Sequence, residues 1–339
     1  MAKDTAYVPI YQPQESGYRN PLYRGDKTPD PCIVYCTHNH CYYGAHTHDH
    51  RVLLYRSETL SGMFCGEPKV VYEPNEADKT YGSFWAPELH FIDGRWYIYT
   101  STHQTADNRG FKHVLCLAAK TDDPMDGFEL GGHLNPEVFG IDPTVYQNKR
   151  TGKLYLCFSL VDDGDKATFG KQRLALQEMR SPTAVTGDYT VIAEATYDWE
   201  TVPPYCGKST INEGAYFIES GDRLFIVYSG NGCWSDDYVL GLIEYTGGDF
   251  LSPDAWVKNS VPFMVKGNGN YGPGHATFFY SPDGTELWIC HHCLAHSDPE
   301  NVEIPRYCHC QKVFFDKTGL PLVGMPVPPD VFFRPPAGE

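Results

Sequence analysis

The feature that most constrains this chain of 339 residues is a strand signal that recurs five times along it. Each copy is a run of aromatic and aliphatic residues beside a turn, a composition that favours β-strands. Aligning one aromatic residue from each copy gives steps of 55, 58, 70 and 63 residues, which are long for a four-stranded repeat. The aligned residues are Tyr42, Tyr97, Tyr155, Phe225 and Trp288. Five units of this size account for nearly the whole chain.

A second short strand is expected before each copy. These strands are expected at residues 31–35, 89–92, 143–146, 215–218 and 276–280. Turn dipeptides such as Asp93-Gly94 and Asp283-Gly284 join the two strands of a unit into a hairpin. Repeated antiparallel units bury their faces against one another, and radial closure leaves only short protected edges. The sequence therefore predicts an all-β fold, a five-bladed β-propeller.

We expect one domain over residues 1–339, with blades that begin near residues 30, 88, 142, 213 and 275. A doubly wound α/β sheet is the weaker interpretation. It would need amphipathic segments of about 10 to 15 residues between the strands, and these are missing from the sequence.

Composition places the chain among globular proteins and narrows its partners. Hydrophobic residues make up 41% of the chain and charged residues 21%, a balance that allows a sizeable core and excludes disorder. The mean hydropathy of −0.41 argues against a membrane protein. The 27 Lys and Arg residues face 43 Asp and Glu residues, and the net charge of −16 repels phosphate backbones and anionic lipids. We expect neither nucleic acid nor a membrane as a partner.

The N-terminal residues and the cysteines bear on the compartment. Residues 1–10 contain Lys3 and Asp4 and no apolar core of about seven residues, so they encode no secretory signal. We therefore expect a cytoplasmic protein, with secretion as the alternative if the sequence had been trimmed at a signal site. The 12 cysteines are then expected to be free thiols rather than a disulfide framework.

Two groups of residues resemble metal ligands. Cys290-His291-His292-Cys293 and Cys308-His309-Cys310 offer soft ligands close together, but residues 290 and 293 of a strand point to opposite faces. A structural zinc ion is therefore the weaker interpretation. The side chains of His46, His48 and His50 lie on one face if the segment is extended, and a polar rim is favoured there over a metal site.

One polar residue stands just ahead of the first strand of every unit. These residues are Asp30, Glu88, Asp142, Glu213 and His275. They precede the aligned aromatic residues by 12, 9, 13, 12 and 13 residues, so four share one register and Glu88 differs. Innermost strands of a propeller line its axis, and we expect these side chains to meet at one mouth of a central channel. Flanking Pro and Gly residues suit a rigid site that a ligand approaches closely.

Carboxylates gathered in a partly dry pocket repel one another, and this repulsion raises at least one pKa. Acid/base chemistry explains such an arrangement better than stability does. Inverting glycoside hydrolysis requires two carboxyl groups about 6.5 to 9.5 Å apart, one protonated and one ionised. The sequence thus favours a glycoside hydrolase over a glycan-binding protein, which gains little from gathering like charges.

At these residues the chain resembles glycoside hydrolase family 43, which comprises five-bladed propeller arabinofuranosidases, arabinanases and xylosidases. The motifs that carry the resemblance are Thr28-Pro29-Asp30-Pro31, Trp85-Ala86-Pro87-Glu88, Gly140-Ile141-Asp142-Pro143, Asn212-Glu213-Gly214 and Gly272-Pro273-Gly274-His275. The resemblance implies that Asp30 is the general base and Glu213 the general acid. It implies that Asp142 raises the pKa of that acid and orients it, whereas Glu88 is left structural.

The resemblance also implies that Trp85, His275 and Arg306 bind substrate. Trp85 either stacks on a sugar ring or packs between blades, and Arg306 is either a sugar ligand or a solvated surface residue. His275 corresponds to an axial histidine beside a central calcium ion or water, which makes His275 the candidate metal ligand. The resemblance implies no required cofactor, with one Ca²⁺ near His275 as an option.

The segment from Tyr228 to Trp234 and residues 272–275 look most like those of exo-acting α-1,5-L-arabinofuranosidases. The resemblance therefore implies an inverting enzyme that removes terminal L-arabinofuranose from arabino-oligosaccharides or related plant-polysaccharide fragments. The alternatives are a β-xylosidase or an anhydrogalactosidase on the same fold, and a glycan-binding propeller without catalysis.

Overall fold

The computed structural model describes residues 13–48, 50–103, 105, 111–162, 171–202, 210–298, 301 and 303–339. Residues 1–10, on which the compartment prediction rested, lie outside this part of the chain. Within it the regular structure consists of β-strands and five 3-10 helices of three residues each. The prediction of an all-β chain is confirmed. No helix among the described residues is long and apolar enough to cross a lipid bilayer.

Most strands belong to five antiparallel groups that follow one another along the chain. The first group is β2 (Cys32–Cys36), β3 (Cys41–Ala45), β4 (Val52–Ser57) and β5 (Lys69–Tyr72). The second group is β6 (Trp85–Ile92), β7 (Arg95–His103), β8 (Lys112–Ala119) and β9 (Phe128–His133). The third group is β10 (Gly140–Gln147), β11 (Leu154–Val161) and β12 (Lys171–Ser181), with β13 (Ala184–Val185) and β14 (Thr190–Ala193) both paired to β12. The fourth group is β15 (Thr210–Ser220), β16 (Arg223–Gly230), β17 (Val239–Tyr245) and β18 (Trp256–Lys258). The fifth group is β19 (Tyr271–Tyr280), β20 (Leu287–Leu294) and β21 (Arg306–Lys312).

The remaining elements are short. The strands are β1 (Tyr18–Arg19), β22 (Phe314–Phe315), β23 (Pro321–Leu322) and β24 (Phe332–Phe333). The 3-10 helices are η1 (Leu60–Gly62), η2 (Glu76–Asp78), η3 (Pro124–Asp126), η4 (Asp198–Glu200) and η5 (Pro253–Ala255). Asn75 and Asp123 begin η2 and η3, and their side chains accept hydrogen bonds from backbone N–H groups of the first turn.

The hairpins expected from the turn dipeptides are present in every group. The first strand of each group pairs antiparallel with the second: β2 with β3, β6 with β7, β10 with β11, β15 with β16 and β19 with β20. The third and fourth groups are additionally joined by a short parallel contact, in which Lys171 and Gln172 face Thr210 and Ile211. This contact brings Gln172 beside the start of β15.

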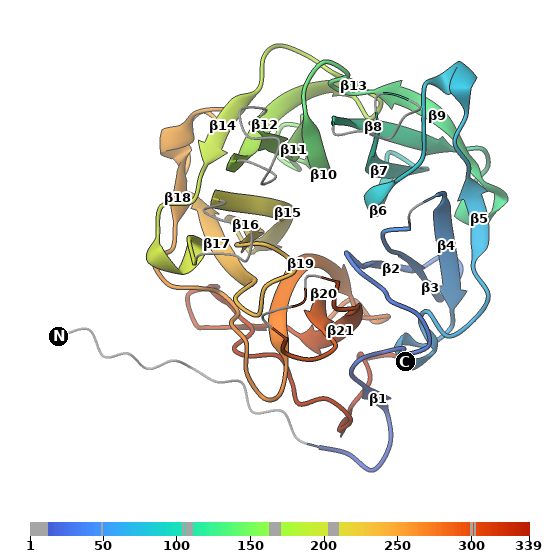
Figure 1. Cartoon of the computed structure of the whole chain (residues 1–339), viewed down its shortest axis with the longest axis vertical. Coiled ribbons are helices and arrows are strands. Elements are labelled where there is room, and N and C mark those ends of the chain that lie inside the picture. Colours follow the sequence, from blue (N-terminus) through green and yellow to red (C-terminus); the bar gives the residue numbers. More distant parts are fainter. Residues whose placement is uncertain are drawn as a thin grey trace.

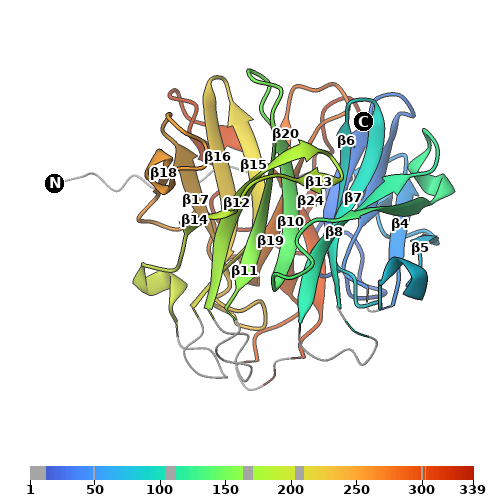
Figure 2. The ribbon, with the colours of Figure 1, turned by 90° about the horizontal axis from the view of Figure 1, so that it is seen from above.

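The five groups are arranged around a common centre, and their first strands lie nearest to it (Figure 1). Each first strand contacts the first strand of the next group, and β19 contacts β2, so that the sequence of contacts returns to its start. Seen from the side, the strands run between the two faces of the molecule (Figure 2). The N-terminal ends of the first strands therefore have a shared location near the centre.

The hydrophobic core is divided in the same way as the strands. Five apolar clusters join the first group to the second, the second to the third, the third to the fourth, the fourth to the fifth, and the fifth back to the first. Strands β8, β11 and β20 are buried along their whole length, because neighbouring groups cover both of their faces. This double coverage accounts for the apolar and aromatic runs that recur in the sequence.

The two ends of the described chain are joined. Strand β1 pairs with β24 through Tyr18–Phe333 and Arg19–Phe332. The side chain of Asn20 donates to the carbonyl of Cys310 at 2.8 Å and accepts from its N–H at 2.9 Å. The segment after β1 is thereby held along β21, which fixes the approach of the chain to Asp30.

Candidate active site

The backbone turns sharply where the first strands begin. Asp30, Asp142 and His275 have φ values of 52°, 52° and 48°, in the left-handed region that side-chain-bearing residues seldom adopt. In the second and fourth groups the corresponding residues are Ala86 (φ 46°) and Gly214 (φ 55°). The ladders of β6, β10, β15 and β19 are irregular at these points. Such bulges re-aim side chains, here toward the centre of the molecule.

The positive-φ residues explain why Glu88 stands out of register in the sequence. The residue of the second group that shares the backbone conformation of Asp30 is Ala86, two residues earlier. Glu88 is buried, its Oε2 lies 2.8 Å from Nε2 of His90, and it is not among the residues that line the central pocket. The location agrees with the structural role expected for Glu88.

A pocket of about 710 Å³ opens at this end of the first strands. It is lined by all six predicted site residues, which are Asp30, Trp85, Asp142, Glu213, His275 and Arg306. These residues come from all five groups of strands or from the segments leading into them. The structure therefore brings together the side chains that the sequence pattern selected, although their catalytic and binding roles stay predictions.

Asp30 lies among donors and positive charge. Its Oδ1 accepts a hydrogen bond from Nη1 of Arg306 at 2.8 Å, and its Oδ2 accepts from the hydroxyl of Thr47 at 2.6 Å. Nδ1 of His275 is 3.5 Å from Oδ1. Burial opposes ionisation of Asp30, but the charge of Arg306, with a smaller effect from His275, outweighs it and holds the pKa well below its usual range. Asp30 is therefore ionised at neutral pH.

Glu213 has a contrasting environment. Its side chain is buried, and Oε1 accepts a hydrogen bond from the hydroxyl of Tyr238 at 2.8 Å. Burial raises the pKa of Glu213 to about 7, and the charge of Asp30 adds to this shift against the opposing effects of Tyr238 and Arg306. A large fraction of Glu213 thus carries a proton near neutral pH.

Asp142 is linked to the main chain beside Glu213. Its Oδ2 accepts a hydrogen bond from the N–H of Gly214 at 3.2 Å and lies 4.0 Å from Nδ1 of His275. Burial raises the pKa of Asp142 to about 7, with His275 opposing and the carboxyls of Glu213 and Asp30 adding to the shift. Glycine is favoured at position 214, because φ is positive there and a Cβ would lie 3.1 Å from Nδ1 of His275, which would have to shift.

Two carboxylate oxygens lie near the ring of His275. Nδ1 is 3.5 Å from Oδ1 of Asp30 and 4.0 Å from Oδ2 of Asp142. The main-chain N–H of His275 donates to the hydroxyl of Ser229 at 2.8 Å. Calcium takes about six to eight oxygen ligands, so a calcium ion beside this imidazole would need water to complete its coordination. The option of a calcium ion near His275, and His275 as its ligand, stay predictions.

Trp85 and Arg306 both line the pocket. Nζ of Lys112 lies 4.1 Å from the centroid of the Trp85 ring, so one face of the indole takes a cation. Arg306 donates a hydrogen bond to Asp30 rather than lying free in solvent. Burial of the guanidinium acts to lower the pKa of Arg306, but the charge of Asp30 outweighs burial and raises it. The interpretation of Arg306 as a solvated surface residue is therefore wrong.

The pocket and its surroundings also include residues that were not singled out as site residues from the sequence. Among them are Thr47, Gln172, Tyr238 and His292. Gln172 lines the pocket and is 2% exposed, and within the part of the chain that the structure describes its buried Oε1 has no hydrogen-bond partner. His292 belongs to the motif Cys290-His291-His292-Cys293, which the sequence offered as a candidate zinc site. The sequence therefore marked this residue, but for metal binding rather than for a contact with Asp30. Thr47 and Tyr238 carry no pattern that distinguishes them in the sequence.

The three histidines near β3 do not form a common rim. His46 is buried, with Nε2 3.3 Å from the hydroxyl of Tyr55, and burial lowers its pKa. His46 and His48 both line the pocket, whereas His50 is exposed. The first part of this segment is therefore pocket wall rather than solvated surface.

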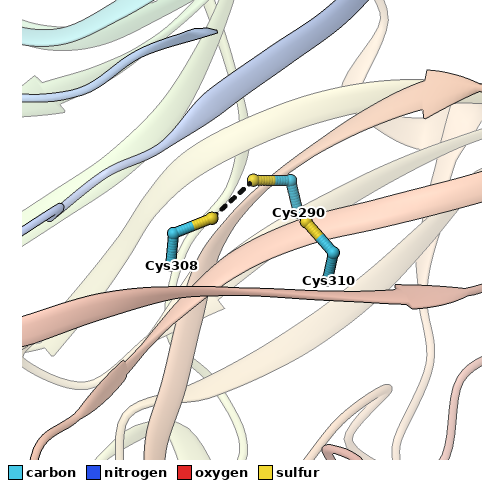
Figure 3. Close-up of side chains that lie close together, drawn as sticks. All are labelled: Cys290, Cys308 and Cys310. Carbon is cyan, nitrogen blue, oxygen red and sulfur yellow. Dashed lines mark hydrogen bonds between the residues drawn. The ribbon is translucent and has the colours of Figure 1, made fainter. Parts of the chain in front are cut away.

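The cysteine-rich motifs form a buried thiol cluster. Cys290 of β20 and Cys308 and Cys310 of β21 lie close together (Figure 3). Their Sγ atoms are all within 4.8 Å of one another. Burial raises the pKa of each thiol well above its usual value, so the three groups are neutral thiols. Cys293 has its Sγ 3.7 Å from Nδ1 of His291 and is not part of the cluster. The cluster packs in the apolar core between the fifth and first groups, and the preference against zinc stays a prediction.

The eleven cysteines among the described residues are free, as expected from the sequence. Cys206 lies outside the described residues.

Comparisons with known proteins agree on one family. The model of glycosyl hydrolases family 43 matches residues 18–321. An extracellular exo-α-(1→5)-L-arabinofuranosidase of Streptomyces avermitilis is 29% identical over 320 residues, which is 91% of this chain and 64% of the relative. The enzyme of the same name from Streptomyces chartreusis is 30% identical over 294 residues, 84% of this chain and 85% of the relative. The chain thus spans less than two thirds of the first relative's length and most of the second's.

A solved structure gives the same result in three dimensions. The crystal structure of an α-L-arabinofuranosidase from Lactobacillus brevis superposes with a TM-score of 0.79 at 25% identity. The match covers 92% of this chain and 98% of the other. Similarity therefore extends over nearly the whole of both chains.

The prediction of a cytoplasmic location is wrong. Both Streptomyces relatives are named extracellular enzymes. The prediction depended on a missing apolar segment in residues 1–10, and a missing segment at one end of a sequence is weak ground for assigning a compartment.

Proposed function

Since the chain belongs to glycosyl hydrolases family 43, it is a glycoside hydrolase, and we propose that it removes terminal L-arabinofuranose from arabino-oligosaccharides with inversion of configuration. The observation that carries the proposal is one pocket holding two carboxyl groups with opposite proton affinities. Asp30 is held ionised, whereas about half of Glu213 carries a proton at neutral pH. Inverting hydrolysis needs this combination of a base and an acid.

The proposed reaction uses protein groups for every proton transfer. Asp30 takes a proton from a water molecule, and the water oxygen bonds the anomeric carbon of the sugar. The glycosidic bond breaks on the opposite face, and Glu213 gives its proton to the departing oxygen. Inversion follows because the new bond forms opposite the one that breaks. Arg306 and Thr47 hold Asp30 ionised, and Asp142 fixes the main chain after Glu213.

Trp85, His275 and Arg306 are proposed to bind the sugar. All three line the pocket, and the exposed part of the Trp85 indole offers an apolar surface for a sugar ring. The Arg306 guanidinium has donors beyond the one that bonds Asp30, and these suit sugar hydroxyls.

The fold proposed for the whole chain is a single five-bladed β-propeller over residues 1–339. The closed sequence of contacts between first strands and the five inter-group clusters support this architecture. A radial arrangement explains why carboxyl groups from different blades meet at one end of the axis.

The substrate proposal is supported by the names of the relatives. Two relatives are named exo-α-(1→5)-L-arabinofuranosidases, and the solved relative is named an α-L-arabinofuranosidase. We therefore propose arabino-oligosaccharides, or related fragments of plant polysaccharides, as the substrate class. A β-xylosidase, an anhydrogalactosidase and a non-catalytic glycan-binding protein are the outcomes against which the proposal is tested.

Proton NMR during hydrolysis of arabinotriose tests sugar, cleavage position and stereochemistry together. We expect arabinose and arabinobiose as first products, with the β-anomer of arabinose appearing first. A first-formed α-anomer would contradict inversion. Faster turnover of nitrophenyl xyloside than of nitrophenyl arabinofuranoside would support the xylosidase, and binding by calorimetry without released sugar would support the glycan-binding protein.

A further inference from the structure

His292 is fully buried in β20, and its ring reaches the backbone of Asp30 across 262 positions of sequence. The N–H of Asp30 points at Nδ1 of His292 at a distance of 3.1 Å. Asp30 lies just before β2 with φ 52°, a strained conformation that persists only where the surrounding structure holds it. A partly buried N–H also needs an acceptor, and His292 supplies it.

The hydrogen bond fixes the tautomer of His292. Nδ1 accepts the Asp30 N–H when the neutral ring carries its proton on Nε2, a buried atom without a hydrogen-bond partner among the described residues. Nδ1 is also 3.4 Å from Oδ1 of Asp30, a contact between two acceptors in this tautomer. The groups that face the ring are Asp30, His275, Arg306 and Tyr238. Burial, with Arg306 and His275, lowers the pKa of His292 to about 3 against the opposing effect of Asp30, in keeping with a neutral ring.

The His292 ring also stacks on Tyr238, the residue that donates a hydrogen bond to Glu213. The rings of His292 and Tyr238 are stacked, with centroids 5.4 Å apart and an angle of 11° between their planes. The Tyr238 hydroxyl donates to Oε1 of Glu213 at 2.8 Å. Gly274 faces His292 in the ladder, and a Cβ at Gly274 would come within 2.0 Å of the Tyr238 ring. The glycine therefore makes room for Tyr238 to lie against His292.

We propose that His292 is a positioning residue that, together with Tyr238, holds Asp30 and Glu213 at a fixed separation. The continuous path runs from the Asp30 N–H through the His292 and Tyr238 rings to the Glu213 carboxyl. The inference rests on the proposed function, in which these two carboxyls are the base and the acid. Inversion requires room for one water between base and sugar, and a displacement of about 1 Å can lower the rate about 100-fold.

Two substitutions separate the hydrogen bond from the stacking. His292→Phe keeps a flat ring but removes the acceptor, and His292→Asn keeps an acceptor near the position of Nδ1 but removes the ring. We expect kcat to fall about 100-fold in His292→Phe and about 10-fold in His292→Asn, with KM changed less than about twofold. If His292 only filled space, kcat would not be higher in His292→Asn than in His292→Phe.

His291→Phe is the matched control. His291 is equally buried in β20, but its ring packs against His309, with centroids 5.8 Å apart. We expect His291→Phe to lower the thermal unfolding midpoint without lowering kcat more than about twofold. An equal loss of kcat in the His291 and His292 variants would overturn the proposal, because His292 would then be only structural.

Hydrogen exchange of the Asp30 amide gives a readout that does not need activity. His292→Phe is expected to speed this exchange about tenfold, whereas His292→Asn and His291→Phe leave it near the wild-type rate. Unchanged exchange in His292→Phe would overturn the proposal. If the wild-type protein hydrolyses no glycoside but Asp30 exchange responds as expected, the proposed function fails and the link between Asp30 and His292 stands.

The wild-type protein offers a test that is independent of how any variant folds. Nitrogen-15 NMR of histidine-labelled protein is expected to show the Nε2–H tautomer for His292 at neutral pH. An Nδ1–H tautomer or an imidazolium would contradict acceptance of the Asp30 N–H and would overturn the proposal.

Discussion

Two carboxyl groups in one pocket, that of the proposed base Asp30 and that of the proposed acid Glu213, have opposite shifts in pKa. Asp30 and Glu213 are both largely withdrawn from solvent, with 11% of the Asp30 side chain and 8% of the whole Glu213 residue exposed. Asp30 bonds a guanidinium and a hydroxyl, and its pKa falls well below the usual range. Glu213 bonds a neutral hydroxyl, that of Tyr238, and its pKa rises to about 7.

The comparison shows that burial alone does not set the protonation state of a carboxyl group. Burial opposes ionisation at both residues, but at Asp30 a nearby cation outweighs it. The protein can therefore hold one carboxyl ionised and another protonated within a single pocket of about 710 Å³. Substitutions on the two sides should separate these effects.

The largest effect is expected from removing either carboxyl group. We expect Asp30→Asn and Glu213→Ala each to lower kcat about 10⁴-fold on arabinotriose, because each loses a proton-transfer step. The two variants should differ on nitrophenyl arabinofuranoside, whose leaving group needs little protonation. Steady-state kinetics should then show recovery of Glu213→Ala but not of Asp30→Asn.

Glu88→Gln is the control for these variants, because Glu88 is a buried acidic residue outside the pocket. Near-normal turnover of Glu213→Ala on arabinotriose would remove Glu213 as the acid.

Arg306→Met should weaken mainly the base, Asp30. Losing the guanidinium removes the main attraction that holds Asp30 ionised, so the pKa of Asp30 should rise. We expect kcat/KM to fall about 100-fold and the acidic limb of its pH profile to move to higher pH. Arg24→Met, which breaks an exposed ion pair with Asp330, should leave the profile unchanged. An acidic limb that stays in place in Arg306→Met would show that Arg306 does not control Asp30.

Glu213→Gln should stabilise the protein at alkaline pH while removing activity. The pKa of Glu213 is raised from its ordinary value of 4.5 to about 7 in the folded protein, so the folded state binds the proton more tightly. Stability is lost as pH rises from about 4.5 to 7, and the full loss, about 3 kcal/mol, persists above that range. The glutamine variant escapes this loss.

Urea unfolding at pH 9 and at pH 4 measures the difference. The variant should be about 3 kcal/mol more stable than wild type at pH 9 and nearly equal to it at pH 4. A constant difference at both pH values would indicate a packing effect rather than a charge effect.

Tyr238→Phe should produce the smallest change, and on the acid side alone. The hydroxyl favours the ionised form of Glu213, so its loss should raise the pKa of Glu213 further. In wild type, kcat should decline as pH rises through about 7, and in Tyr238→Phe this alkaline limb should move to higher pH. We expect kcat at pH 6 to change less than about tenfold. A limb that moves to lower pH would contradict the assignment of Glu213 as the titrating acid.

The strands of this protein could be predicted from local sequence. Turn dipeptides such as Asp93-Gly94 and runs such as residues 94–101 favour hairpins wherever they occur, and the observed β6 and β7 pair as expected. The residues ahead of the first strands were found because they recur at nearly constant spacing. Glu88 was correctly set apart, although only the backbone shows that Ala86 takes the equivalent place.

Other features could not be predicted in this way. Thr47 and Tyr238 belong to no repeat, and each acts through a single hydroxyl that reaches a carboxyl from another segment. The cysteine and histidine motif of β20 was weighed for zinc, yet it supplies the residue that bonds the Asp30 backbone. The compartment was predicted wrongly from ten residues at one end of the chain.

The sequence by itself determined that the chain forms repeated antiparallel strands and that Asp30, Asp142 and Glu213 precede three of them, because periodicity and turn chemistry act over a few residues. Only the tertiary structure decided which carboxyl is ionised. Arg306 and His292 lie 276 and 262 positions from Asp30 in sequence, yet both are within hydrogen-bonding distance of it. A pKa depends on charges and donors within a few ångströms, and it is the folding of the chain that brings them there.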